Sequence, residues 1–230
     1  MKVLIGYSAC QITREAFEKQ GHDAWTCDLL PARGNSKNHI TADVWTIIDQ
    51  GWDLGIFHPM CTFLNCASAW ALSDPNFEKY PDGGYHQKVK SETLTGQTRR
   101  EAQDAAVENF IRLIRLPFPK AIENPAPSMV SKYIRPPDQI VQPYEFGHDA
   151  SKSTGLWLEG LSPLEPTKYV APSIIKFRGR NVRRWANQSP AGQEKSPPSA
   201  ERWLERSKTF EGIAEAMGEQ WGNPRQKDLF

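Results

Sequence analysis

Short apolar runs recur along the first two-thirds of the sequence, and amphipathic stretches separate them. The apolar runs have the length of buried strands. They predict strands at Lys2–Gly6, Ala24–Asp28, His39–Asp43, Asp53–Phe57, Lys120–Glu123, Gln139–Gln142 and Leu156–Leu158. The amphipathic stretches predict helices at Ile12–Gln20, Val44–Gln50, Arg99–Leu116 and Phe210–Trp221. Strands that alternate with helices indicate an α/β fold, with a mostly parallel sheet covered by helices on both faces.

The chain has 230 residues, enough for one large domain and a small appendage. We expect an α/β domain over residues 1–162 and a short, basic, irregular segment over residues 163–198. The remaining residues, 199–230, are expected to carry a helix that packs back on the first domain. A long loop rich in proline and glycine is predicted over Ser73–Thr98, and loops of this length are often functional.

Charge and composition exclude several protein classes without indicating a partner. The 28 Lys and Arg residues nearly balance the 27 Asp and Glu residues, so any affinity for nucleic acid has to come from a local patch. No apolar run approaches the ~20 residues of a membrane span. Four cysteines in a chain of this length do not make a disulfide scaffold, so a reducing cytosol is expected. We therefore expect a cytoplasmic protein without membrane contact.

Polar side chains follow the predicted strands at the places where an open parallel sheet binds its ligands. The sequence has Tyr7, Ser8 and Ala9 after the first strand, and Asp28 and Asp43 at the ends of the next two. A carboxylate accepts both hydroxyl protons of a ribose, and a second acid suits an adenine amino group. The pair therefore favours a nucleotide site. The alternative for each acid is a cap of the following turn or helix.

Cys61 and Glu123 follow two further predicted strands. Cys61 lies in a loop after Pro59, and Glu123 ends an apolar strand, so burial is expected to raise the pKa of its carboxyl group. A thiol beside a protonated acid suits addition to an electron-poor ring, with attack on carbon and protonation of a ring nitrogen. The alternatives are a buried structural cysteine and a buried ion pair of Glu123 with Arg or Lys. Cys61 and Cys66 lack companion ligands at zinc-site spacing, so no metal is expected.

Taken together, the motifs Tyr-Ser-Ala, two acidic strand ends, Pro-Met-Cys and Glu-Asn-Pro resemble those of the cytosine-C5 DNA methyltransferases. The stretches CDLLPARGN, GHDASKSTGLWLEGL and RSKTFEGIAEAMGEQWG look like those of small phage-type members of that group. The resemblance implies a Rossmann-like, S-adenosylmethionine-dependent methyltransferase fold. It implies catalysis by Cys61 and Glu123, cofactor binding by Tyr7, Ser8, Ala9, Asp28, Asp43 and Pro59, and substrate binding by Asn124 and Lys152.

The chain departs from that family in three ways. Ala9 replaces a glycine in the first turn, which is formed by Tyr7, Ser8 and Ala9 after the first strand. The replacement would cost roughly 1–2 kcal/mol if the position needs a positive φ. Met60 replaces a proline and changes the rigidity of the Cys61 loop. No large target-recognition domain is present, and residues 163–198 are its reduced counterpart.

That segment is nevertheless basic, with no acid between Glu165 and Glu194. Its cations are Lys168, Lys176, Arg178, Arg180, Arg183 and Arg184, interleaved with Tyr169, Phe177 and Trp185. Cations among aromatic rings suit phosphate contacts and base stacking, so we expect the four arginines to bind DNA, duplex or single-stranded. The alternative is a solvated basic loop. Likewise, His58 is either a proton shuttle or the donor of a structural hydrogen bond.

Three hypotheses follow. The first is methyl transfer from S-adenosylmethionine to carbon 5 of cytosine in DNA, with Cys61 adding at carbon 6. The second is the same chemistry on a free pyrimidine nucleotide, because the large recognition domain is missing. The third is a catalytically weak descendant that binds nucleic acid or a host protein. The resemblance to phage-type proteins implies action in the cytoplasm of a host cell, on the phage's own DNA.

Overall fold

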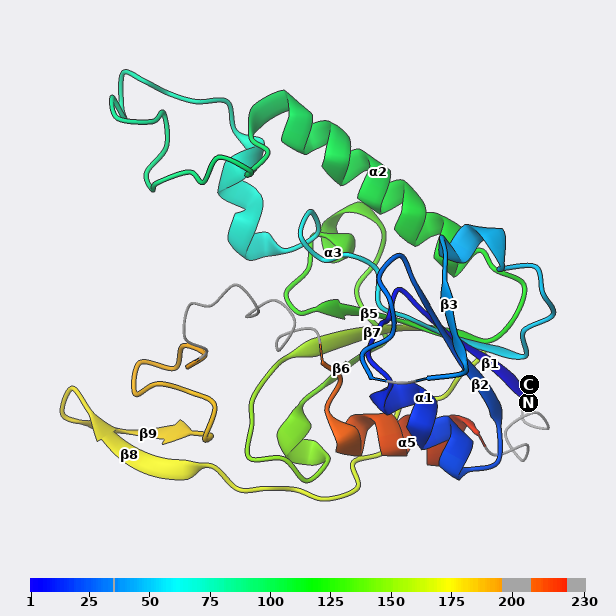
Figure 1. The fold of residues 1–230 in the computed structure, drawn as a ribbon. Helices are drawn as coiled ribbons and strands as arrows, with labels where there is room; N and C mark the ends of the chain where they lie inside the picture. Colours follow the sequence, from blue (N-terminus) through cyan, green and yellow to red (C-terminus); the bar gives the residue numbers. More distant parts are fainter. Residues whose placement is uncertain (35, 196–207, 223–230) are drawn as a thin grey trace.

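The computed structural model describes residues 1–34, 36–195 and 208–222, and its main sheet has seven strands in the order β3-β2-β1-β4-β5-β7-β6 (Figure 1). The strands are β1 (Lys2–Gly6), β2 (Asp23–Asp28), β3 (His39–Thr41), β4 (Leu54–Phe57), β5 (Lys120–Pro125), β6 (Gln139–Val141) and β7 (Thr154–Glu159). Every strand predicted from the apolar runs is present.

The sheet is mixed but mostly parallel. The five strands from β3 to β5 are parallel, and β7 runs antiparallel to its neighbours β5 and β6. The predicted α/β class is therefore confirmed. Because the order reverses between β1 and β4, the carboxyl ends of these two strands form the switch point at which such sheets bind ligands.

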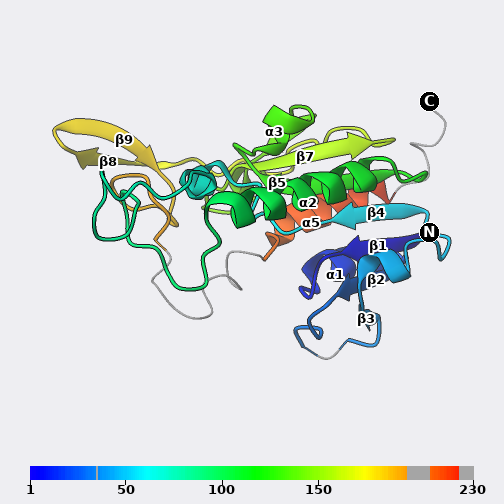
Figure 2. The same cartoon turned by 90° about the horizontal axis from the view of Figure 1, so that it is seen from above.

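Helices cover both faces of the sheet (Figure 2). They are α1 (Ile12–Lys19), α2 (Gly96–Ile114), α3 (Val130–Tyr133) and α5 (Glu211–Trp221), with short 3₁₀ helices η1 (Val44–Thr46), η2 (Cys66–Leu72) and η3 (Pro143–Glu145). Side chains alternate along each strand between two cores. Ile56 belongs to the core under α1 and α5, with Phe17 and Met217, whereas Phe57 belongs to the core under α2, with Phe110.

The C-terminal helix α5 lies against α1 near the start of the chain (Figure 1). A Cβ atom at Gly218 would lie 2.9 Å from the carbonyl oxygen of Ala16, so the missing side chain allows the two helices to approach closely. The parts of the predicted appendage at 196–207 and 223–230 lie outside the described residues.

The predicted helix over Val44–Gln50 is wrong, because only the single turn η1 forms there. Its sequence, VWTIIDQ, contains four β-branched residues, which disfavour an α-helix. Trp52 also donates its indole N–H to the carbonyl oxygen of Ile47 at 2.8 Å, which satisfies that carbonyl without a further helical turn.

The prediction that residues 163–198 are irregular is wrong in part, because the segment contains the hairpin β8 (Ser173–Phe177) and β9 (Arg180–Arg184). Arg178 and Gly179 connect the two strands, with φ of 49° and 77°. Two positive φ values in a two-residue loop are typical of a type I′ turn, whose twist matches that of an antiparallel pair. Ile174, Ile175 and Val182 supply the strand propensity on either side.

Within the described ranges, no helix is both long and apolar enough to cross a membrane. The same part of the chain contains no group of three or more His, Cys, Asp or Glu residues placed to hold a metal ion.

Candidate functional site

The carboxyl ends of four adjacent strands align in one row across the sheet. Gly6 of β1 lies beside Cys27 of β2 and Phe57 of β4, and Phe57 lies beside Ile122 of β5. The residues one step further along these strands are Tyr7, Asp28, His58 and Glu123. The register of the sheet therefore brings together residues that are far apart in the sequence.

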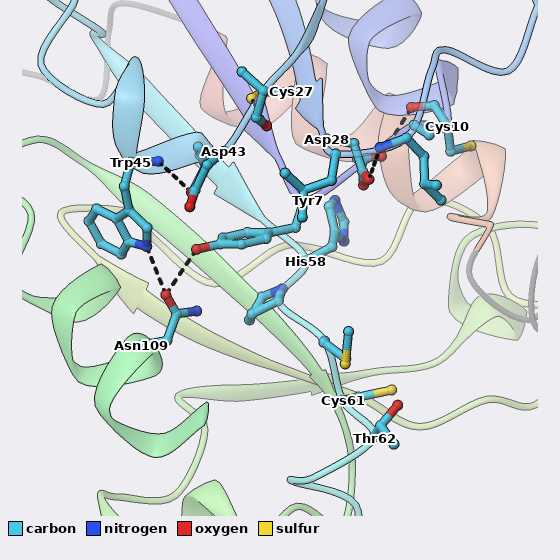
Figure 3. Close-up of a pocket in the computed structure, with 18 of the residues that line it drawn as sticks. Tyr7, Cys10, Cys27, Asp28, Asp43, Trp45, His58, Cys61, Thr62 and Asn109 are labelled. Atoms are coloured by element: carbon cyan, nitrogen blue, oxygen red, sulfur yellow. Dashed lines mark hydrogen bonds between the residues drawn. The ribbon is translucent and has the colours of Figure 1, made fainter. Parts of the chain in front are cut away.

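A cavity of about 630 Å³ opens at this row (Figure 3). Its lining includes seven predicted site residues, which are Tyr7, Ser8, Ala9, Asp28, Asp43, Pro59 and Cys61. The lining residues that the sequence analysis did not single out include Arg33, Trp45 and Asn109. The predicted cofactor residues and the predicted nucleophile thus share one cavity.

The first turn carries its strain at Tyr7 instead of at Ala9. Tyr7 has a φ of 58°, whereas Ala9 is outside the positive-φ region, so the expected cost of alanine at this turn does not arise. The Tyr7 hydroxyl donates to Asn109 Oδ1 at 3.0 Å, and the same oxygen accepts from Trp45 Nε1 at 2.9 Å. Burial outweighs these contacts and raises the pKa of Tyr7 to about 12, so the hydroxyl stays protonated at neutral pH.

Asn109 is therefore the acceptor that holds an aromatic wall of the cavity in place (Figure 3). It lies on α2, far in sequence from the strand ends, and a lone asparagine on a helix gives no sequence signal for this role.

Each of the two predicted acids caps a turn with one oxygen. Asp28 Oδ1 accepts from the backbone N–H of Leu30 at 2.9 Å, and Asp43 Oδ1 accepts from that of Trp45 at 3.0 Å. No hydrogen bond to Oδ2 of either acid comes from the described part of the chain. The capping alternative is thus correct for one oxygen of each carboxylate, and the other oxygen remains available to a ligand.

Cys61 follows β4 in a loop that α2 anchors. Arg99 donates to the carbonyl oxygen of Thr62 at 2.6 Å, and Gln103 donates to that of Phe63 at 2.9 Å. Both anchoring side chains are buried, whereas the Cys61 side chain is only partly so. The rigidity of this loop therefore comes from contacts after the cysteine, and not from the residue before it. Met60 is 65% exposed and contributes little packing.

Glu123 reaches the cavity through His58, which lines it, while Glu123 itself does not. Its Oε2 atom is hydrogen bonded to His58 Nδ1. Burial by itself raises the pKa of Glu123, but the hydrogen bond and charge of His58, together with the charge of Lys152, lower that pKa to about 2. The predicted raised pKa is wrong, because a partner across the sheet outweighs burial. That partner is a histidine, where the alternative interpretation expected Arg or Lys.

The other predicted substrate residues lie outside the cavity lining. Asn124 is 1% exposed and accepts from the Ser128 hydroxyl at 2.9 Å, so its carboxamide faces the interior. Lys152 lies close enough to Glu123 to lower its pKa, and its backbone N–H donates to Gln142 Oε1 at 3.0 Å.

The four predicted DNA-binding arginines, Arg178, Arg180, Arg183 and Arg184, all lie on the β8–β9 hairpin. The hairpin extends beyond the end of the sheet at which β1 and β4 terminate (Figure 2). Trp185 joins it to the main domain by stacking on Tyr144 at a centroid distance of 4.2 Å.

Comparison with known proteins adds no family. No model of a protein family matches this sequence, and no curated protein matches it significantly.

Proposed function

We propose that this protein is an S-adenosylmethionine-dependent methyltransferase that acts on carbon 5 of cytosine in DNA. The observation that carries the proposal is the cavity that joins the first turn, Asp28, Asp43 and Cys61 at the switch point of the sheet. This reaction needs a nucleotide-binding site for the cofactor and a thiol nucleophile in the same cavity.

The residues present suit the cofactor. The cavity volume of about 630 Å³ falls within the usual range for small-molecule sites. Asp28 and Asp43 offer their Oδ2 atoms to the ribose hydroxyls and the adenine amino group, respectively. The strand order supports the same proposal. The antiparallel strand β7, inserted between β5 and β6, is the arrangement expected of the methyltransferase fold that the motifs resemble.

The chemistry starts at Cys61. Its thiolate forms a bond to carbon 6 of the pyrimidine, and the electron pair of the 5,6 double bond moves to form a double bond between carbons 5 and 4. The electron pair of the double bond between carbon 4 and nitrogen 3 moves to nitrogen 3, which takes a proton from an acid in the site. S-adenosylmethionine, when bound, supplies the methyl group that carbon 5 accepts. Nitrogen 3 then returns its proton to the acid, and carbon 5 gives its proton to a base. The bond from carbon 6 to Cys61 breaks, and the thiolate is restored.

The hairpin favours DNA as the acceptor over a free nucleotide. One of its faces is exposed and carries Ile174, Lys176, Asn181 and Arg183. A two-stranded ribbon fits the major groove, where Asn pairs with adenine and an apolar side chain contacts the thymine methyl group. Its cations contact the phosphates that flank the groove. A free nucleotide would use none of these groups.

Transfer of tritiated methyl from S-adenosylmethionine tests the proposal, with duplex DNA, single-stranded DNA and dCMP as acceptors. We expect transfer to DNA and its loss in Cys61→Ala. Cys66→Ala is the matched control, because Cys66 is also partly buried but does not line the cavity. Transfer that persists in Cys61→Ala, or that occurs to no acceptor, would overturn the proposal. A preference for dCMP would overturn the assignment of DNA.

A covalent trap gives a second readout. When S-adenosylmethionine is added to DNA that contains 5-fluorocytosine, carbon 5 carries both fluorine and the transferred methyl group. No proton is left there for a base to remove, so the bond to Cys61 persists. We expect a protein–DNA adduct that resists denaturing electrophoresis in the native protein and in Cys66→Ala, but not in Cys61→Ala.

A further inference from the structure

His58 lies on the wall of the cavity, between Tyr7 and the loop that carries Cys61 (Figure 3). Its Nδ1 atom is bonded to Glu123 Oε2. Its other ring nitrogen, Nε2, is buried and has no hydrogen-bond partner among the described residues. A buried imidazole nitrogen without a partner is costly, so the site gains stability when a ligand supplies a hydrogen-bond partner there.

The surroundings of Glu123 favour its ionised form. Because the pKa of Glu123 is lowered to about 2 by His58 and Lys152 against the effect of burial, its side chain is a carboxylate near neutral pH. A carboxylate only accepts hydrogen bonds, so the proton between the two residues belongs to His58 Nδ1. Glu123 therefore has no proton to give to a substrate, although the reaction proposed above needs one at ring nitrogen 3.

We propose that His58 is the catalytic acid that protonates ring nitrogen 3 of the pyrimidine, and that Glu123 is a positioning residue that orients the His58 ring through Nδ1. This inference rests on the proposed function. As Cys61 adds to carbon 6, the Nε2–H bond of His58 breaks and the nitrogen 3–hydrogen bond forms. The electron pair of the broken bond stays on Nε2. Neutral His58 keeps its Nδ1 proton bonded to Glu123, and it takes the second proton back when the thiolate leaves.

The His58–Glu123 pair is arranged like a catalytic histidine that a carboxylate orients. The carboxylate fixes which nitrogen faces the substrate without itself becoming protonated. The register of the sheet supplies this orientation, because His58 and Glu123 each follow directly after the paired residues Phe57 and Ile122.

The rate of addition to 5-fluorocytosine DNA, measured over a pH series in a single turnover, tests the inference. Several titratable or charged groups face this site, namely Tyr7, Asp28, Arg33, Asp43, Cys61, Glu123 and Lys152. His58→Gln keeps a donor for Glu123 but has no acidic proton. We expect it to slow adduct formation by about 100- to 10,000-fold, the usual contribution of a general acid. Binding of S-adenosylmethionine, measured by calorimetry, is expected to stay unchanged.

Glu123→Gln separates the two possible donors. If His58 is the donor, this variant retains activity at acidic pH, where an imidazole is protonated. If Glu123 were the donor, Glu123→Gln would be inactive at every pH, and His58→Gln would keep most of its rate. Either of those two results overturns the inference.

His86→Gln is the matched control, since His86 packs on Trp70 and Tyr80 outside the cavity. If His58→Gln does not fold, the profiles of the native protein and of Glu123→Gln still decide the matter. A native rate that does not fall as the pH rises through the titration of a histidine overturns the inference. Absence of any adduct in the native protein would instead refute the proposed function, so the two failures are distinguishable.

Discussion

Neutralising the exposed cations of the β8–β9 hairpin should weaken DNA binding by an amount that the structure fixes. Lys176, Arg180 and Arg183 are exposed and form no ion pair with the described residues. Arg184 differs, because its guanidinium donates to the carbonyl oxygen of Pro190 at 3.1 Å. Arg178 is exposed as well, but it lies in the turn, with its guanidinium 5.2 Å from the centre of the Phe177 ring. We therefore expect three phosphate contacts from the exposed cations of the two strands.

Each phosphate contact that is lost reduces the slope of log affinity against log salt concentration by about 0.9. The triple variant Lys176→Gln, Arg180→Gln, Arg183→Gln should thus lower the slope by about 2.7, which at 0.1 M salt corresponds to about 500-fold weaker binding. Fluorescence anisotropy of a labelled duplex, titrated at several salt concentrations, measures both quantities.

The control is a variant in which three exposed cations elsewhere are replaced by glutamine, at Lys19, Arg115 and Lys132. It changes the net charge by the same amount but leaves the hairpin intact. The reasoning is refuted if the control lowers the slope as much as the hairpin variant does, because the effect would then come from net charge. It is also refuted if the hairpin variant leaves the slope unchanged.

Three further predictions concern the cavity and its surroundings. Asn109→Leu leaves the Tyr7 hydroxyl and the Trp45 indole without their acceptor, so we expect a loss of about 1–3 kcal/mol in urea unfolding and weaker cofactor binding by calorimetry. Tyr7→Phe, which removes only one donor, should cost less. The lowered pKa of Glu123 contributes stability that is fully present above about pH 4.5 and is lost as the pH falls through about 2. Glu123→Gln should therefore flatten the acid side of the stability–pH curve, and an unchanged curve would contradict this. Arg99→Met removes donors to the Cys61 loop, so we expect slower adduct formation with 5-fluorocytosine DNA at unchanged cofactor affinity. A loss of cofactor affinity as large as the loss of rate would instead indicate general unfolding.

The strands and most of the cavity could be predicted from the sequence for the same physical reason. Strands buried on both faces are continuous apolar runs, and a polar residue that follows such a run lies at the carboxyl end of its strand. Tyr7, Asp28, Asp43 and Cys61 could therefore be placed without a structure. Asn109 could not, because its role depends on how α2 crosses the sheet, and no local pattern encodes that crossing.

The β8–β9 hairpin shows a second limit of structure prediction from the sequence. Prolines and charged residues in the segment around it suggested irregular structure, whereas the two residues Arg178 and Gly179 carried the decisive signal. A short loop with glycine between runs of β-branched residues predicts a hairpin even where the flanking sequence is polar. The basic character of the segment was predicted correctly from the sequence, but its regular structure was not, and the pairing of the two strands sets the register of their cations.

The pairing of His58 with Glu123 shows why a pKa is harder to predict from sequence than a strand. The two residues are 65 positions apart, and they meet only because Phe57 pairs with Ile122. The opposite faces of the strands fix this register. Ile56 and Ala121 must enter one core while Phe57 and Ile122 enter the other, so a slip by one residue would exchange the two faces. A slip by two residues would preserve the faces but separate His58 from Glu123, which would leave a buried carboxylate without its partner and raise its pKa. The sign of the pKa shift at Glu123 is therefore a consequence of sheet register, and the sequence alone constrains that register only to within two residues.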